Sequence, residues 1–396
     1  MTSALPALRP VVAAALLVLV SACSGSNGPA STSPSLAPDL PGKLAGASTE
    51  FTGPRALREM SARALRIRYH STSGIDESRT VVTGLVFVPK GAPPEGGWPI
   101  IAVGHATTGM NSSCAPSLYP GLMGGLTSVI PFLANGFLVV MPDYQGLGTP
   151  DVHPYLEPRT AAYNVIDAVR AARYAVEDVS DVWVGYGVSQ GGQAVWAANE
   201  LAPEYGRNLR LLGSISMAAP SDLRPLVDAM VNGTLTDEQK VLVPMVLSGV
   251  QSVHPDLNLD DYLSGEVRKR MDVFLSCAGE QDALRSKIVE NAPATDFAPV
   301  SPVAAEQLRT WLGEFSLPQR QASAPMLVGY GEDDRLIPPA WTEAAVRQAC
   351  SMGDIIDAHL APGQGHGILN FGSLPAEWLG ARLADDPPPS TCVTTP

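Results

Sequence analysis

A Gly-x-Ser-x-Gly pentapeptide directly behind an apolar run constrains this 396-residue chain more than any other segment. Residues 185–192 read Gly-Tyr-Gly-Val-Ser-Gln-Gly-Gly and follow the run Val-Trp-Val at 182–184. Glycine on either side of a serine permits a tight strand-to-helix turn, in which a Cβ atom would crowd its neighbours. Such a turn presents the Ser189 hydroxyl as a nucleophile. Because a pentapeptide can occur by chance, this interpretation requires a histidine, a carboxylate and an oxyanion donor elsewhere in the chain.

Short apolar runs alternate with helical patterns along most of the chain. Residues 63–70 and 79–88 predict an antiparallel pair of strands around a polar turn. Helical patterns follow at 159–176, 189–201 and 339–351. Continuous apolar runs indicate buried parallel strands, here at 100–103, 137–141, 182–184, 211–217, 326–330 and 355–360. This alternation predicts an α/β fold, with a mostly parallel sheet flanked by helices on both faces.

One interval, from Met217 to Met326, is several times longer than a single crossover requires. It contains a capping box at Thr236 to Gln239 and a second helix start at Ser301-Pro302. We therefore expect a helical cap over 221–320, inserted after the strand that follows the nucleophile helix. Its position suits a cover for the site, and the alternative is an insertion remote from the chemistry. The remaining core would comprise 51–220 and 321–396.

The first residues have the pattern of an export signal. Arg9 is the one charged residue in 1–22, and an apolar run from 11 to 20 is too short to span a bilayer. The sequence Val-Ser-Ala-Cys at 20–23 favours a lipobox with lipidated Cys23, while ordinary signal cleavage after Ala22 is the alternative. Residues 23–50, rich in Ser, Pro and Gly, suit a flexible tether. We expect a signal peptide over 1–22, followed by secretion and membrane association only through this anchor.

Charge and motifs exclude several classes of partner. The net charge of −13, with no cluster of Lys and Arg, argues against nucleic-acid binding. The chain has no His-Glu-x-x-His, no close His/Cys pair and no Gly-x-x-x-x-Gly-Lys-Ser/Thr, and Gln190 interrupts a Gly-x-Gly-x-x-Gly pattern. We therefore expect no metal and no cofactor. A small, neutral or weakly polar substrate suits such a chain.

Four cysteines remain when Cys23 is set aside, an even number in an exported chain. Two disulfides are expected, and three pairings are open. Pairing Cys350 with Cys392 would close a short loop, and pairing Cys114 with Cys277 would link the insertion to the core. We favour these two, although the spacing proves neither.

Hydrolysis by serine also needs a base and a carboxylate that orients it. His366 lies in Pro-Gly-Gln-Gly-His-Gly, a glycine-rich loop after the last predicted strand. Asp334 follows the strand predicted over 326–330 and precedes a helix that begins with proline, so it lies between serine and histidine in chain order. Asp333 is the reserve candidate. Among the other histidines, His70 and His359 fit structural positions better.

Two backbone N–H groups are expected to bind the developing oxyanion. One is that of Gln190, the residue after the nucleophile. The other is that of Thr107 in the loop Gly-His-Ala-Thr-Thr-Gly at 104–109, with the Thr107 hydroxyl as an additional donor. His105, in the same loop, is interpreted as a buttress and not as a second catalytic histidine.

Taken together, these motifs resemble the secretory lipase family of α/β-hydrolases, which includes fungal secreted lipases and actinobacterial relatives. The resemblance covers about residues 45–392 and rests on the loop at 104–109, the pentapeptide, the two loops with Asp334 and His366, and three further motifs. These are Cys-Ala-Pro-Ser at 114–117, Pro-Asp-Tyr-Gln-Gly-Leu-Gly at 142–148 and His-Pro-Tyr-Leu at 153–156. The resemblance implies a capped α/β-hydrolase with two disulfides, no cofactor, and hydrolysis of acylglycerols or simpler carboxylic esters. Ala106 departs from the glycine that hydrolases often have there.

Three functional hypotheses follow. The first is a secreted, surface-tethered, monomeric serine esterase or lipase that uses Ser189, His366 and Asp334. The second is a peptidase on the same fold, because a serine triad can cleave amides as well as esters. The third is a non-catalytic lipid-binding protein of the cell envelope. Packing of the 221–320 insertion would decide which acyl group reaches Ser189.

Overall fold

The computed structural model describes residues 40–367 and 369–392. The expected signal peptide over 1–22 and the expected lipidation at Cys23 lie outside these residues. Residues 42–50, which the composition assigned to a flexible tether, are instead hydrogen-bonded to a strand over Ser61–Thr72: Gly42 N donates to His70 O (2.7 Å) and Ala45 N to Arg68 O (2.8 Å). Residues 42–50 therefore do not fit the expectation of a flexible tether, because edge pairing of the backbone leaves little trace in composition.

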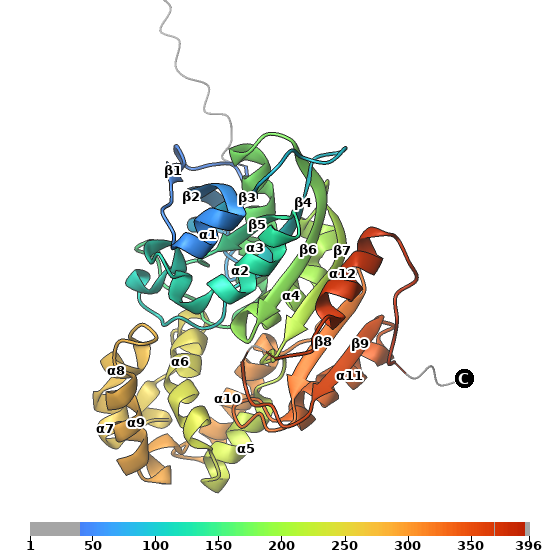
Figure 1. The fold of residues 1–396 in the computed structure, drawn as a ribbon. Coiled ribbons are helices and arrows are strands. Elements are labelled where there is room, and N and C mark those ends of the chain that lie inside the picture. Colours follow the sequence, from blue (N-terminus) through green and yellow to red (C-terminus); the bar gives the residue numbers. More distant parts are fainter. Residues whose placement is uncertain (1–39, 368, 393–396) are drawn as a thin grey trace, which may run out of the picture. The chain divides into compact units, whose positions relative to one another are not determined.

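A single mixed sheet organises the described residues (Figure 1). Its strand order is β1-β2-β3-β5-β4-β6-β7-β8-β9. Pairing is antiparallel from β1 to β5 and parallel from β5 through β4 to β9, so the predicted antiparallel pair and mostly parallel sheet are confirmed. The strands are β1 (Thr49–Glu50), β2 (Ser61–Thr72), β3 (Arg79–Pro89), β4 (Trp98–Gly104), β5 (Leu138–Pro142), β6 (Val179–Val188), β7 (Arg210–Met217), β8 (Met326–Gly331) and β9 (Ile356–Ala361).

Helices cover both faces of the sheet because alternate side chains of its central strands are apolar on both sides. Along β4, Ile100 and Ala102 pack with α3 (Pro158–Ala175), α4 (Gln190–Tyr205) and α11 (Pro339–Ser351). Ile101 and Val103 belong to the opposite core, with α1 (Arg55–Met60), α2 (Leu126–Ala134) and α12 (Leu374–Leu383). The helices expected at 159–176, 189–201 and 339–351 are confirmed as α3, α4 and α11.

The segment between β7 and β8 is helical and lies beyond the carboxyl ends of the parallel strands (Figure 1). The predicted capping box at Thr236 and Gln239 opens α6, and Ser301 caps α10. Its helices pack around a cluster of apolar side chains that also includes Tyr155, Leu156 and Ile337 from outside this segment. They are α5 (Arg224–Asn232), α6 (Asp237–Val253), α7 (Gly265–Lys269), α8 (Met271–Leu275), α9 (Asp282–Asn291) and α10 (Pro302–Phe315). Short 3₁₀ turns complete the chain at Ser112–Cys114, Pro116–Leu118, Leu122–Gly124, Leu259–Asp261 and Ala294–Phe297.

Two disulfides hold peripheral segments to this framework, and they are the two pairings favoured above. Cys114–Cys277 links the region after β4 to the residues that follow α8. Cys350–Cys392 joins α11 to the last described residue. Next to it, Thr391 N donates to Ile356 O (2.7 Å), and Ala358 N donates to the Thr391 hydroxyl (3.0 Å), so this segment runs beside β9.

Candidate active site

Ser189 occupies the turn between β6 and α4, with φ 55° and ψ −121°. This strained backbone is possible because the residues two positions before and two positions after Ser189 are glycines. A Cβ atom on Gly187 would collide with the Gly191 carbonyl, and one on Gly191 would collide with the Gly104 carbonyl. Three backbone segments thus meet at van der Waals distance, and the turn exposes the Ser189 side chain at the carboxyl end of the sheet.

The three expected triad residues are hydrogen-bonded in series. His366 Nε2 lies 2.9 Å from Ser189 Oγ, and His366 Nδ1 lies 2.8 Å from Asp334 Oδ2. An Nδ1–H that donates to Asp334 leaves Nε2 free to accept the serine proton. The structure thus brings together side chains that are 177 and 32 residues apart in sequence.

Asp334 is held rigidly in this series. Its second oxygen, Oδ1, accepts hydrogen bonds from the backbone N–H groups of Leu336 (2.9 Å) and Ile337 (2.8 Å), and the side chain is buried. The reserve candidate Asp333 is exposed and has no hydrogen bond to His366. Glu332 is exposed too and accepts from Gly363 N (2.9 Å). Of the three adjacent carboxylates, only that of Asp334 therefore contacts the histidine.

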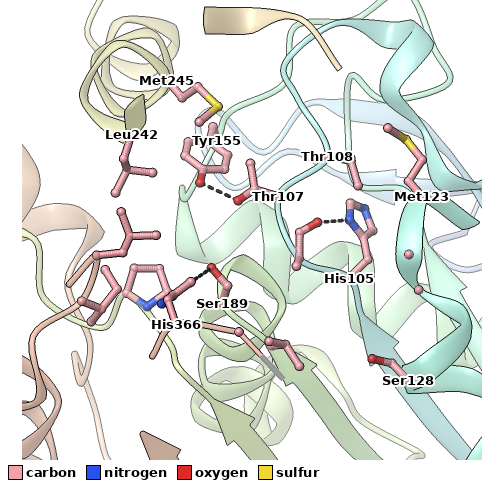
Figure 2. A pocket seen from close by; sticks show the side chains of 18 of the residues that line it. His105, Thr107, Thr108, Met123, Ser128, Tyr155, Ser189, Leu242, Met245 and His366 are labelled. Atoms are coloured by element: carbon pink, nitrogen blue, oxygen red, sulfur yellow. Dashed lines mark hydrogen bonds between the residues drawn. The ribbon is translucent and has the colours of Figure 1, made fainter. Parts of the chain in front are cut away.

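Of the two residues expected to supply oxyanion donors, Gln190 follows Ser189 in the chain and Thr107 lines the same cavity. Gln190 is the first residue of α4, where a backbone N–H has no partner within the helix. Thr107 lines the same pocket as Ser189, and its hydroxyl lies 2.6 Å from the Tyr155 hydroxyl (Figure 2). His105 is buried, with Nδ1 2.6 Å from Ala106 O and Nε2 3.2 Å from Asp143 O. Burial lowers the pKa of His105, and the two contacts of its ring brace the loop.

The sequence patterns indicated no role for three buried polar residues near this loop, namely His153, Asp143 and Tyr155. His153 Nδ1 donates to Gln145 O (2.8 Å), and Nε2 accepts from the Gln190 side-chain amide (3.0 Å). Burial lowers the pKa of His153 to about 4, which keeps it in this neutral form. Asp143 accepts from Ser117 N and the Thr83 hydroxyl.

The third of these residues is Tyr155, which contacts Thr107. The only signal for them in the sequence was their place in the motifs at 142–148 and 153–156.

A largely apolar cavity of about 360 Å³ opens at Ser189 (Figure 2). The sheet side contributes Val103, Met141 and Val188, and the inserted helix α6 contributes Leu242 and Met245. The insertion therefore forms part of the wall, in agreement with the expectation that it covers the site. Within residues 40–367 and 369–392, no group of three or more His, Cys, Asp or Glu side chains could hold a metal ion. Over the same ranges, no helix has both the length and the apolar character to cross a bilayer.

A mostly parallel sheet with a nucleophile elbow after β6 and a helical insertion after β7 defines an α/β-hydrolase fold. Candida antarctica lipase A in its closed state has the same fold, with a TM-score of 0.70 and 16% identity over 90% of this chain and 85% of that protein. The model of the secretory lipase family matches residues 123–391, and the chain belongs to this family.

Curated relatives are similar over much of the chain. Secreted triacylglycerol lipase LIP2 of Malassezia globosa is 23% identical over 83% of this chain and 75% of its own length. Secreted triacylglycerol lipase LIP4 of Malassezia furfur is also 23% identical, over 54% of this chain. That match spans only 40% of the length of the Malassezia furfur protein.

Proposed function

We propose that this protein is a secreted serine hydrolase that cleaves the carboxylic ester bonds of acylglycerols. The observation that carries the proposal is the hydrogen-bonded series from Ser189 through His366 to Asp334 at the mouth of an apolar cavity. Relatives named as secreted triacylglycerol lipases support the substrate class. The cavity wall suits a hydrocarbon chain, because its lining is mainly aliphatic side chains and methionines.

In the proposed mechanism, His366 Nε2 takes the proton of Ser189 Oγ as the oxygen attacks the ester carbonyl carbon. The carbonyl oxygen becomes an oxyanion, stabilised by the N–H groups of Gln190 and Thr107. As the intermediate collapses, the C–O bond to the alcohol breaks, and the imidazolium returns its proton to the leaving oxygen. Water then attacks the acyl-enzyme with His366 again as base, which releases the carboxylic acid and restores Ser189. Asp334 stabilises the transient positive charge on His366.

We further propose a route to the cell surface and a domain organisation. Residues 1–22 act as a signal peptide, Cys23 carries the lipid anchor, and the following residues form the tether of a monomeric enzyme. The core comprises 42–220 and 321–396, because 42–50 pair with β2, and 221–320 is the cap. Mass spectrometry of the mature N-terminal peptide tests the anchor: a diacylglyceryl group on Cys23 supports it, whereas an unmodified N-terminus after Ala22 contradicts it.

The test of the proposed function is a series of p-nitrophenyl esters from C2 to C16, measured on the wild type and on Ser189→Ala. We expect hydrolysis by the wild type and a fall in kcat of at least about 10⁴-fold in the variant, because the nucleophile is removed. Ser351→Ala is a matched control, since Ser351 lies exposed at the end of α11. Wild-type rates in Ser189→Ala would contradict the proposal, and faster cleavage of peptide amides than of esters would point to a peptidase.

A further inference from the structure

A second cavity of about 370 Å³ lies between α2 and α12, on the face of the sheet opposite α3 and α4. One stripe of each helix forms its walls, since the residues involved recur at helical spacing. From α12 these are Ala376, Leu379, Gly380 and Leu383. From α2 they are Thr127, Ser128, Pro131 and Phe132, together with the C-cap residue Asn135. Tyr186 of β6 also lines it, and its ring packs edge-on against Phe132, with centroids 5.0 Å apart. We call this cavity the α2–α12 groove.

The groove is adjacent to the cavity at Ser189. Side chains alternate along a strand, so Tyr186 and Val188 point to the same face of β6, one pleat apart. Tyr186 lines the groove, and Val188 lines the cavity next to Ser189. Both pack in one apolar cluster with Met217 and Trp378. The two hollows therefore follow each other along β6.

Among the described residues, Ser128 alone lines both hollows. Burial raises the pKa of the Tyr186 phenol, and hydrogen bonding with the Ser128 side chain opposes this rise, so the two polar groups interact with each other. A hydrocarbon chain that passes this point therefore leaves no polar group there without a partner. Most of the remaining lining of both hollows is apolar.

The side of Ser189 on which the groove lies indicates which part of an ester, the acyl chain or the alcohol, would enter it. His366 and Leu242 lie on one side of Ser189, and Met123 and Ser128 lie on the other (Figure 2). The alcohol must leave next to His366, because that imidazole returns the proton to the leaving oxygen. The acyl part is then directed toward Met123 and Ser128.

We propose that the α2–α12 groove is an acyl-chain subsite, in which the distal carbons of a long fatty acyl group lie after passing Ser128. The inference rests on the proposed ester hydrolysis and specifies its substrate: long-chain esters use both hollows, and short-chain esters need only the one at Ser189.

Gly380 offers a direct test. It lies on α12, and a Cβ atom there meets nothing within 4 Å, so a larger side chain can extend over the groove without displacing the backbone. Gly380→Phe fills the groove, and Gly380→Ala is the matched control because it changes the helix in the same way and adds only a methyl group. We expect Gly380→Phe to lower the ratio of kcat/KM for C14 over C4 p-nitrophenyl esters by at least about tenfold. This factor corresponds to the lost burial of about two methylene groups. Gly380→Ala should keep the wild-type ratio.

A second measurement separates this inference from the proposed hydrolysis. Tetradecanoic and butanoic acids are titrated calorimetrically into the wild type and Gly380→Phe, because binding of a free acid needs no reaction. Weaker binding of tetradecanoic acid to Gly380→Phe, by a similar factor, supports the groove even if no ester is cleaved. An unchanged C14-to-C4 ratio with unchanged fatty-acid binding overturns it, and so does an equal loss for all chain lengths. Thermal melts check that both variants are folded.

Discussion

The sheet end that bears Ser189 and the inserted helices that face it form one cavity, but they are held in place differently. On the sheet side, β6 is hydrogen-bonded to β4 and β7 along its length, and the elbow glycines leave no space for another backbone path. Main-chain geometry therefore determines the position of Ser189, independently of most surrounding side chains.

The inserted helices have no strand ladder, and they pack around an apolar cluster that they share with Tyr155, Leu156 and Ile337 of the core. Their polar connection near the site is the start of α6, where the Thr236 hydroxyl donates to Arg335 O (2.9 Å) and the Gln239 amide to Leu336 O (3.3 Å). Cys114–Cys277 adds a covalent link. The comparison indicates that the chemistry rests on backbone contacts, whereas the substrate wall rests on side chains, which can vary without displacing the triad.

Removing the Cys114–Cys277 disulfide, which links the two regions, should have the largest effect on the free energy of unfolding. Replacing Cys114 and Cys277 by serine is expected to lower the free energy of unfolding by about 2–5 kcal/mol, because the bond closes a long loop. The ester chain-length profile should also change, since the inserted helices lose an attachment. Urea unfolding and the C2–C16 series measure both effects.

The matched control is the serine replacement of Cys350 and Cys392, a bond remote from the cavity lining. It should lower stability and leave the chain-length profile as in the wild type. If both double variants change the profile equally, the distinction between the two regions fails.

A smaller effect on the free energy of unfolding is expected from the titration of Glu200, which lies where the inserted segment rejoins the core. This α4 carboxylate accepts from Gln319 N (3.2 Å) and Arg320 N (3.3 Å), and burial raises its pKa from 4.5 to about 7. The folded state therefore holds the proton more tightly than the unfolded state. Stability should fall as pH rises from about 4.5 to about 7, by on the order of 1–3 kcal/mol in all.

Glu200→Gln keeps an acceptor and removes the charge, so its stability should lack this decline. Urea unfolding of both proteins between pH 4.5 and 8 measures the difference. Glu204→Gln is the control, because the Glu204 side chain lies exposed on the same helix and should follow the wild type. Parallel pH profiles for wild type and Glu200→Gln would contradict the expectation.

Tyr155 lies where the two regions meet, and its replacement should have the smallest of the three effects, a change in kcat. Burial raises the pKa of Tyr155 to about 12, so the phenol is protonated at neutral pH. Among the described residues its hydroxyl has one hydrogen-bond partner, Thr107 Oγ1. Either hydroxyl can be the donor of this bond. We take the phenol as the donor, which leaves the Thr107 proton free to point toward the oxyanion.

Tyr155→Phe should lower kcat by about tenfold and change KM less than twofold, because only the transition state uses this donor. Steady-state kinetics measure both values, and Tyr174→Phe serves as an exposed control. In a Thr107→Val background, Tyr155→Phe should have no further effect. Additive losses in the double variant would show that Tyr155 acts independently of Thr107.

Strands, main helices and the candidate triad could be predicted because each leaves a local pattern. Ser189, Asp334 and His366 each follow an apolar run, and parallel strands bring their carboxyl ends to one edge. The network of His153 and Tyr155 could not be predicted, because its partners Gln190 and Thr107 are 37 and 48 residues away and meet only in the folded chain.

The walls of the α2–α12 groove were missed for a different reason. Helix α2 contains Pro131, and α12 contains Gly380, so both contain a residue that is unfavourable inside a helix. They form because Val129, Leu133 and Leu379 bury against the sheet, a tertiary contribution that the local pattern does not reveal.

The residues beside β9 have a consequence for how the molecule behaves at high concentration. An edge strand with free N–H and C=O groups can add a strand from another molecule and begin aggregation. In this protein Thr391 occupies the groups of Ile356 and Ala358, and Cys350–Cys392 keeps it there. An oxidising environment thus stabilises more than the fold: it blocks one route by which neighbouring copies could polymerise through their sheets.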